Sequence, residues 1–391
     1  MSFGIRKFLL LILSYLKYSY YSLINPFTKP LSSRTNTKSL LIIKLDEIGD
    51  YILFRNLLKY FKSSERFKDY KITLCGNVVW KSIFDLLDKD TVDSSVWINK
   101  KVFSKDLFYR KELMETVLKQ NYTTVINCSL SRNFFLDDVF VKKALAVEKI
   151  GYKTDLSTQF KWQKKISDRD YTNLIDVNDE TFDFRRNKKF INSILKTEIV
   201  ETLPVIDKYW MKSDLTLNEK YVVLYIGGRT NYKIWKVDNF IEVAKYINEK
   251  YGLKIFLLGS QEDVDLSLEF ENRFNNQSVN NLTARTTLID VIKILNRASI
   301  MIGNDSGLAH IAAALNTKLI VIANGTHLGR FFPYPEEDAN VKAIYPYEIE
   351  THLKHFNEVV EKYKYRSRLD INSVLPENVI NEVDNFLGLN H

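Results

Sequence analysis

The stretch Met301 to Leu315, MIGNDSGLAHIAAAL, indicates how this chain folds. The apolar segment Ala298 to Ile302, which precedes Asp305, is typical of a buried strand, and the alanine-rich stretch after Gly307 favours a helix. Asp305 and Ser306 stand at the turn between them. Such side chains cap a helix or bind a ligand hydroxyl, and the free N–H groups of a helix N-terminus attract anions. The stretch therefore predicts a strand–turn–helix unit whose turn is either a helix cap or a ligand site.

The same alternation of strand and helix runs through most of the chain. Strands alternating with helices imply parallel β–α units and an α/β fold. In the first half, apolar runs predict strands near 40–45, 71–75 and 124–128, and helical patterns cover 52–61, 111–119 and 187–195. In the second half, strands are predicted at 221–226, 254–258, 299–302 and 318–323, with helices near 237–251, 262–274, 287–297 and 307–315. The weakly periodic interval 153–183 predicts loops that offer a binding surface.

Length and composition set the domain organisation. A chain of 391 residues, 45% hydrophobic and 27% charged, suits two folded domains. We expect a basic helix and linker over 1–35, α/β domains over 36–210 and 211–345, and a helical tail over 346–391 that packs back on the N-terminal domain. The domain boundary should fall within 203–218. Cys75 and Cys128 end apolar runs without metal-ligand spacing, which predicts buried thiols in a reducing compartment.

The positive charge is concentrated at the N-terminus. Of the net charge of +8, residues 1–40 carry +6 without an acidic residue. This distribution argues against a nucleic-acid groove, which requires basic residues clustered on the folded surface. Apolar residues recur there at helical spacing, which predicts an amphipathic helix on an anionic membrane surface. The uncharged run Phe8 to Leu16 is too short to span a bilayer. A signal peptide or anchor, and a helix that packs on the protein's own core, remain alternatives.

Four ordered segments resemble glycosyltransferase family 9, the heptosyltransferase-like enzymes. GNDSGLAHIAAAL at 303–315 is similar to the family signature, and LLIIKLDEIGD at 40–50 is similar to its first strand and IGD loop. YVVLYIGGRTNYKIW at 221–235 resembles the strand and K-x-W segment that open the nucleotide-binding half. IFLLGSQE at 255–262 resembles the next strand and loop. The matches extend over most of the chain.

The resemblance implies a GT-B fold, with two Rossmann-like, doubly wound domains facing a central cleft. The acceptor would bind the first domain and the nucleotide-sugar the second. The implied reaction is an inverting, metal-independent transfer of heptose or a similar sugar, for example from ADP-heptose, to a lipid-linked saccharide such as lipopolysaccharide core. No cofactor or metal site is expected. The protein would be a bacterial enzyme attached peripherally to the cytoplasmic face of the membrane.

Asp50 is the residue that the resemblance identifies as the general base. It follows Gly49 at the end of the first strand, where a carboxylate can project towards a ligand. A sugar hydroxyl is too weak an acid to attack unaided, and a positioned base contributes typically 10²–10⁴-fold. A plain helix N-cap is the alternative role for Asp50. Asp46 and Glu47 lie in the same loop, so either is an alternative base.

The donor site is expected in the second half. Lys233 matches the family lysine that neutralises the leaving diphosphate, with Arg229 and Thr230 as secondary phosphate contacts. Many members have proline where this chain has Lys236, which leaves the start of the next helix less defined. Gln261 or Glu262 is expected on the nucleotide ribose.

Asp305, Ser306 and Gly307 form the expected donor-binding turn. His310, one helical turn further on, is interpreted as a hydrogen-bonded core residue. Arg132, which follows the third predicted strand, is expected either to hold an anionic acceptor group or to lie on the surface.

Two other classes of function fit parts of this pattern. A sugar-nucleotide epimerase on the same scaffold would need an acid and a base around the donor sugar but neither acceptor site nor membrane helix, so the basic N-terminus argues against it. A non-catalytic nucleotide-sugar-binding protein would keep the turn at Asp305 while Asp50 became dispensable.

Overall fold

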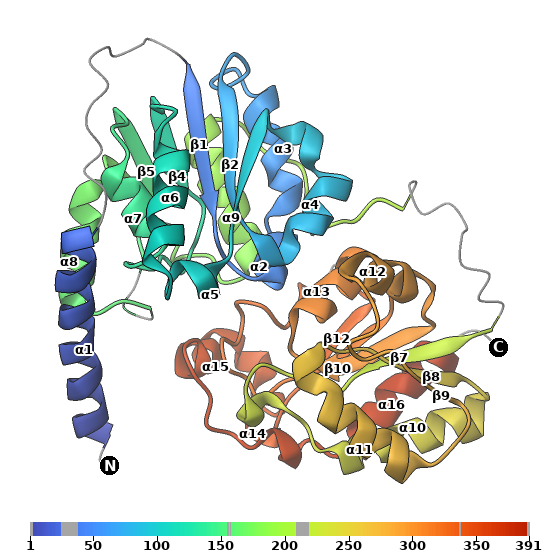
Figure 1. Cartoon of the computed structure of the whole chain (residues 1–391). Coiled ribbons are helices and arrows are strands. Elements are labelled where there is room, and N and C mark those ends of the chain that lie inside the picture. Colours follow the sequence, from blue (N-terminus) through green and yellow to red (C-terminus); the bar gives the residue numbers. More distant parts are fainter. Residues whose placement is uncertain are drawn as a thin grey trace. The chain divides into compact units, whose positions relative to one another are not determined.

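The computed structural model describes residues 3–24, 38–154, 156, 158–208, 219–335 and 338–388, with side chains in the first helix described from Phe8 to Tyr21. The chain divides into two compact units (Figure 1). Unit 1 comprises Met1–Glu47, Leu57–Asp179 and Arg186–Ile199; unit 2 comprises Ile48–Asn56, Glu180–Arg185 and Val200–His391. The predicted linker after the first helix, and most of the predicted boundary interval, lie outside the described residues.

Unit 1 is built on six parallel strands in the order β3-β2-β1-β4-β5-β6. β1 is central and buried along its whole length, which explains its continuous apolar sequence LLII. The strands are β1 Ser39–Lys44, β2 Lys71–Asn77, β3 Ser94–Ile98, β4 Thr124–Asn127, β5 Glu148–Tyr152 and β6 Asn173–Ile175.

Helices cover both faces of this sheet (Figure 1). The helices that lie wholly or mainly in unit 1 are α1 Phe3–Ile24, α3 Arg55–Ser63, α4 Lys81–Leu87, α5 Lys100–Phe103, α6 Leu107–Leu118, α7 Asp137–Lys143, α8 Lys161–Ser167 and α9 Asp183–Leu195, with the 3-10 turns η1 Val78–Trp80, η2 Lys89–Thr91 and η3 Asp168–Asp170. Cys75 and Cys128 are buried free thiols, as predicted.

Helix α1 lies beside α8, where Tyr15 stacks on Trp162 with ring centroids 4.2 Å apart (Figure 1). Tyr21 is buried, and its hydroxyl donates a hydrogen bond to the backbone oxygen of Ser104. The aromatic face of α1 therefore packs on unit 1, whereas most of its leucines are exposed. None of the described helices is long and apolar enough to cross a bilayer.

Unit 2 repeats the architecture with strands in the order β12-β11-β10-β7-β8-β9, all parallel. The order reverses between β7 and β10, and in such sheets ligands bind at the carboxyl ends of the two strands at this switch point. The strands are β7 Tyr221–Tyr225, β8 Lys254–Leu257, β9 Val279–Asn281, β10 Ile300–Asn304, β11 Leu319–Ile322 and β12 Val341–Ile344. The prediction of an α/β fold with two doubly wound sheets is confirmed.

In the core of unit 2, side chains of α10, α11 and α16 meet the strands. The helices of this unit are α2 Ile48–Ile52, α10 Val237–Tyr251, α11 Val264–Phe274, α12 Leu288–Arg297, α13 Gly307–Ala314, α14 Tyr347–Glu350, α15 Phe356–Tyr363 and α16 Pro376–Leu387, with the 3-10 turns η4 Asn231–Lys233, η5 Gln261–Asp263, η6 Leu353–His355 and η7 Ile371–Ser373.

The structure differs from the sequence-based expectation in three places. The tail was expected on the N-terminal domain, but α16 packs on α10, β11 and β12, because its buried Val379 and Val383 join the core of unit 2. The helix predicted over 52–61 is α3, which begins three residues later at Arg55, and a separate short helix, α2, precedes it and ends at Ile52. The interval 153–183, expected as loops, contains α8 and β6, which are seven and three residues long and so too short to show a period.

Candidate functional site

The carboxyl ends of β7 and β10 lie side by side in the sheet of unit 2, with Tyr225 paired to Gly303. The loop after β7 carries Lys233, and the turn after β10 carries Asp305 and Ser306. Lys233 and Asp305 are 72 residues apart in the sequence, and both contribute side chains to this edge of the unit 2 sheet.

The buried side chain of Asn304 joins these two loops. Its amide nitrogen donates to the backbone oxygens of Ile226, at 3.2 Å, and Gly227, at 2.8 Å, while its oxygen accepts from the backbone N–H of Trp235. Trp235 is itself fully buried and donates its indole N–H to Val374. Three hydrogen bonds from one carboxamide thus fix both ends of the loop that presents Lys233.

Lys233 and Asp305 form an ion pair in which Nζ and Oδ2 are 2.8 Å apart. The two side chains are 20% and 12% exposed, so the pair is accessible to a ligand without being fully solvated. A diphosphate would compete with Asp305 for the ammonium group, and the released carboxylate would then be available to a sugar or ribose hydroxyl. Arg229, exposed, and Thr230 precede Lys233 on the same loop.

Ser306 occupies the N-cap position of α13 but makes no capping hydrogen bond with its side chain. Its hydroxyl is buried and has no hydrogen-bond partner within the described part of the chain. A buried hydroxyl without a partner is costly, and here it lies beside the free N–H groups of a helix N-terminus. These features favour a ligand-binding turn over the plain helix cap that the sequence also allowed.

The loop after β8 contributes a third segment to this edge. Asp263 is buried and accepts hydrogen bonds from Ser260 and from the backbone N–H of Gly228, which joins this loop to the β7 loop. A side chain at Gly227 would place its Cβ 2.0 Å from Oδ1 of Asp263, so only glycine fits there. Gln261 and Glu262, the predicted ribose contacts, are both exposed on this loop.

Helix α2 packs directly on α13. A Cβ at Gly307 would lie 3.2 Å from the backbone nitrogen of Gly49, and a Cβ at Gly49 would lie 2.7 Å from Cδ2 of His310. Glycine at both positions therefore allows the two helices to approach closely. The consequence is that Asp50, which follows Gly49, lies on a helix in contact with the helix that Ser306 begins.

Asp50 is 19% exposed and is held by Arg330, whose guanidinium lies 3.5 Å from its Oδ1. Nε of Arg330 donates to Oδ2 of the buried Asp183 at 2.8 Å, and the backbone oxygen of Arg330 accepts from the backbone N–H of Asp183. Arg330 is thus fixed on two sides by one residue and directs its charge to Asp50. Sequence analysis did not identify Arg330 or Asp183, and their separation of 147 residues gives no local signal.

His310 is buried, and its Nδ1 lies 3.0 Å from the hydroxyl of Tyr334. Its ring stacks on Phe332 at 4.9 Å. Burial lowers the pKa of His310 from 6.5 to about 4, so the ring is neutral at physiological pH. The interpretation of His310 as a hydrogen-bonded core residue agrees with these contacts.

The remaining predicted site residues lie in unit 1. Asp46 pairs with the buried Lys44 at 2.8 Å, and Glu47 pairs with Lys100 at 2.5 Å, so both alternative bases have cationic partners there. Arg132 is fully buried, forms an ion pair with Asp168 and lies over the ring of Tyr171, 4.5 Å from its centroid. Its expected acceptor contact stays a prediction, and the surface alternative does not agree with its burial.

Among the described residues, no cluster of three or more His, Cys, Asp or Glu side chains could hold a metal ion. Lys233, Arg229, Arg330 and the N-terminus of α13 contribute positive charge near this edge.

Comparison with known proteins identifies similar sequences and folds. Residues 110–360 match the model of glycosyltransferase family 9 (heptosyltransferase). Lipopolysaccharide heptosyltransferase 1 of Campylobacter coli is 23% identical over 299 residues, which cover 73% of this chain and 83% of that protein. Lipopolysaccharide heptosyltransferase 2 of Escherichia coli K12 is 26% identical over 158 residues, covering 40% of this chain and 43% of that protein.

Solved structures share the fold at lower identity. The family 9 glycosyltransferase of Veillonella parvula has a TM-score of 0.69 at 16% identity, over 90% of this chain and 97% of that one. The Escherichia coli heptosyltransferase WaaC with ADP has a TM-score of 0.68 at 16% identity, over 89% of this chain and 99% of that one.

The low pKa of His310 predicts a specific loss of stability in acid. The unfolded chain takes up a proton near pH 6.5 while the folded chain resists it down to about pH 4, so the free energy of unfolding should fall as pH decreases across this interval. His310→Gln should show a smaller fall than the wild type in urea unfolding measured at a series of pH values. The exposed His355→Gln is the matched control. An unchanged pH dependence in His310→Gln would contradict this role.

Proposed function

The chain belongs to glycosyltransferase family 9, and on that premise we propose that this glycosyltransferase is inverting and metal-independent. It moves heptose or a similar sugar from a nucleotide-sugar, with ADP-heptose as the first candidate, to a lipid-linked saccharide such as lipopolysaccharide core. The names of its relatives, lipopolysaccharide heptosyltransferases, and the ADP bound to WaaC support this choice of substrates.

One observation carries the proposal. Helix α2, which carries Asp50, packs against α13. Ser306 is the N-cap residue of α13, and the residue before it, Asp305, forms the ion pair with Lys233. A carboxylate suited to deprotonating an acceptor hydroxyl and a set of groups suited to a diphosphate therefore belong to one packed arrangement within unit 2.

The reaction follows from the chemistry of these groups. The diphosphate accepts hydrogen bonds from Lys233, from the N–H groups that begin α13 and from the Ser306 hydroxyl. The acceptor hydroxyl gives its proton to Asp50, and its oxygen attacks the anomeric carbon from the side opposite the diphosphate. The bond from that carbon to the diphosphate oxygen breaks, and the configuration inverts. Arg330 orients the Asp50 carboxylate, and Lys233 with the α13 N-terminus stabilises the charge on the leaving group.

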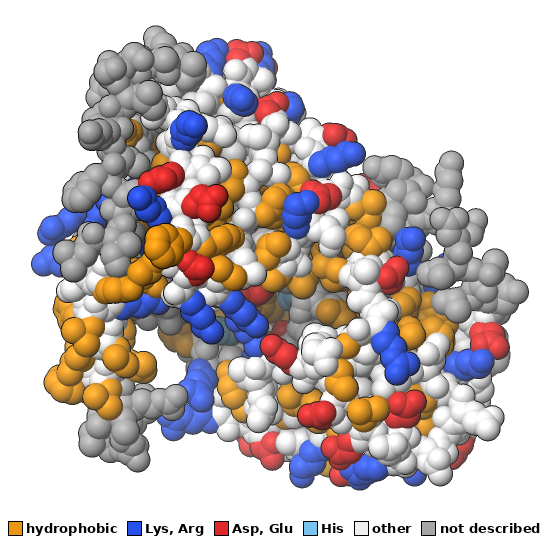
Figure 2. All heavy atoms as spheres, in the orientation of Figure 1, with side chains coloured by type: hydrophobic (Ala, Val, Ile, Leu, Met, Phe, Trp, Pro, Cys, Tyr) orange, Lys and Arg blue, Asp and Glu red, His pale blue; other side chains and the backbone are white. Residues whose placement is uncertain are grey.

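The acceptor is proposed to be membrane-borne because of α1. Phe8, Leu13 and Leu16 on this helix are 62%, 58% and 61% exposed (Figure 2, orange spheres over α1). A contiguous exposed apolar surface on a helix that also carries Arg6, Lys7 and Lys17 in sequence is complementary to an anionic lipid surface. We place the enzyme on the cytoplasmic side, attached peripherally to the cell membrane.

Mass-spectrometric screening of nucleotide-sugars, with and without extracted lipid-linked glycan, tests this function. Release of nucleoside diphosphate that depends on the glycan, together with a glycan heavier by one sugar, is the expected result. Conversion of the donor to an epimer without glycan would identify the epimerase alternative instead. Binding of donors without turnover under any condition would identify a non-catalytic protein.

Replacement of the proposed base gives the sharpest test of the mechanism. Asp50→Asn should lower turnover by roughly 10² or more and leave donor binding within a few-fold, because the amide keeps the shape but cannot accept the proton. Glu47→Gln, three residues before Asp50 and just outside α2, is the matched variant and should turn over within a few-fold of wild type. The reverse pattern in steady-state kinetics would identify Glu47 as the base.

Lys233→Ala should weaken nucleoside diphosphate binding by about 1.5–3 kcal/mol, the range for hydrogen bonds to charged groups. The change also leaves Asp305 without its cationic partner, which adds repulsion towards the phosphates. Isothermal calorimetry with the diphosphate measures the loss. Lys236→Ala, three residues further on and exposed, should bind as the wild type does. Equal affinities for all three proteins would remove Lys233 from the site.

The exposed face of α1 should determine vesicle binding. Leu13→Ser with Leu16→Ser should lower the affinity for anionic vesicles at least about tenfold, and wild-type binding should weaken as salt rises. Folding should be unaffected because both leucines are exposed. The control variant has serine in place of Leu145 and Val147, two apolar residues that are exposed elsewhere in unit 1. Equal vesicle flotation of both variants and wild type would refute the membrane role of this face.

A further inference from the structure

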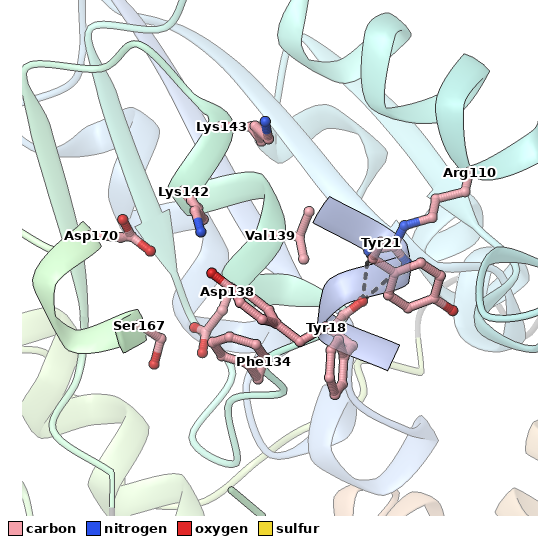
Figure 3. A pocket seen from close by; sticks show the side chains of 11 residues that line it. Tyr18, Tyr21, Arg110, Phe134, Asp138, Val139, Lys142, Lys143, Ser167 and Asp170 are labelled. Atoms are coloured by element: carbon pink, nitrogen blue, oxygen red, sulfur yellow. Dashed lines mark hydrogen bonds between the residues drawn. The ribbon is translucent and has the colours of Figure 1, made fainter. Parts of the chain in front are cut away.

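A cavity of about 180 Å³ lies in unit 1 between the inner face of α1 and the helices α6, α7 and α8 with η3 (Figure 3). This volume far exceeds the roughly 10–15 Å³ that one water needs. Its walls combine aromatic side chains from α1 and the segment before α7 with charged side chains from α6, α7 and η3. None of the candidate donor or catalytic residues lines it.

Arg110 is the unusual residue of this cavity, because it is 2% exposed and no carboxylate among the described residues acts on its charge. Its guanidinium lies between two rings, 4.1 Å from the centroid of Tyr21 and 4.3 Å from that of Phe103. Both terminal nitrogens donate to the backbone oxygen of Phe135 at 3.1 Å, while Nε has no hydrogen-bond partner in the described part of the chain. A buried cation that lacks both a counterion and one hydrogen bond is costly, which suggests that a ligand supplies them.

Other cations surround the same space. Lys17 of α1 lies over the ring of Phe135, 4.9 Å from its centroid, and Lys142 of α7 lies 5.5 Å from the centroid of Tyr18. Lys143 also lines the cavity. Burial lowers the pKa of Lys17, and the nearby charge of Arg110 lowers it further, so Lys17 and Arg110 repel each other.

Two carboxylates, Asp138 and Asp170, also line the cavity. Asp138 accepts hydrogen bonds from Tyr171 and Gln159, both at 2.6 Å, and lies 3.9 Å from Arg132, so its charge is used elsewhere. Burial raises the pKa of Asp170, and the nearby charges of Lys142 and Lys149 oppose this rise. The three cations that line the cavity, Arg110, Lys142 and Lys143, still outnumber its two carboxylates.

We propose that this cavity binds a phosphate group, with Arg110, Lys142 and Lys143 as its contacts. The free N–H of Arg110 and the two ammonium groups match a tetrahedral anion that accepts several hydrogen bonds. Because Tyr18 and Tyr21 of α1 form one wall, an occupied cavity stabilises α1 against unit 1. The headgroup of an anionic lipid is one source of the phosphate, which rests on the proposed membrane contact of α1, and free phosphate is the other.

Thermal unfolding in sodium phosphate and in sodium chloride of equal ionic strength tests the site. Phosphate should raise the Tm of the wild type by a few degrees relative to chloride. Arg110→Met should lose this rise, and Lys111→Met, the exposed neighbour on α6, should keep it. Lys233→Ala should also keep it, which separates the cavity from the diphosphate site. Should Arg110→Met fail to fold, Lys142→Gln with Lys143→Gln near the surface gives the same test.

Flotation with vesicles distinguishes the two sources of phosphate. If Arg110→Met also binds phosphatidylglycerol vesicles less tightly than the wild type, with no difference on phosphatidylcholine, the headgroup is the ligand. If vesicle binding is unchanged and only the Tm rise is lost, the ligand is free phosphate. A wild-type Tm that does not respond to phosphate, or a rise that persists in Arg110→Met and in the Lys142 and Lys143 variant, would overturn the proposal. Neither readout depends on glycosyl transfer, so failure of the proposed reaction would leave this site standing.

Discussion

The close contact of α2 with α13 is the constraint on which the candidate site depends. An added Cβ at Gly49 would lie 2.7 Å from the His310 ring, too close without a shift of that ring, and one at Gly307 would lie 3.2 Å from the Gly49 nitrogen, a tight contact. The buried neutral ring of His310 fills the space between the helices. Asp50 and Ser306 are each adjacent to one of these glycines, so the position of the proposed base relative to the donor turn is set by backbone packing.

Two polar networks complete this arrangement at the edge of the second sheet. Asn304 connects the loops after β7 and β10 and so fixes the segment that carries Lys233. Arg330 connects Asp183 with Asp50 and so fixes the orientation of the carboxylate. Because Lys233 is paired with Asp305 before any ligand binds, the diphosphate has to compete for a cation that is already oriented. The site is preorganised by interactions outside the reacting groups.

The sequence predicted the parts of this protein that local patterns encode. Continuous apolar runs identified β1, β7 and β10, since strands buried on both faces have no polar period. The turn at Asp305 was evident because a strand, a polar pair and an alanine-rich helix follow one another. Arg330 and Asp183 were missed because their contact joins residues 147 apart. The burial of Arg132 and the packing of the aromatic face of α1 on unit 1 depend on tertiary contacts, which no single segment reveals.

The most direct test of the central claim is the Gly49→Ala variant, assayed for both kcat of transfer and Kd for nucleoside diphosphate. The added methyl would meet the His310 ring at 2.7 Å and displace α2 from α13. If the α2–α13 contact positions the base independently of the diphosphate site, kcat should fall at least about tenfold while Kd stays within a factor of two. An unchanged kcat, or a loss of diphosphate affinity as large as the loss of kcat in a protein that remains folded, would contradict the account.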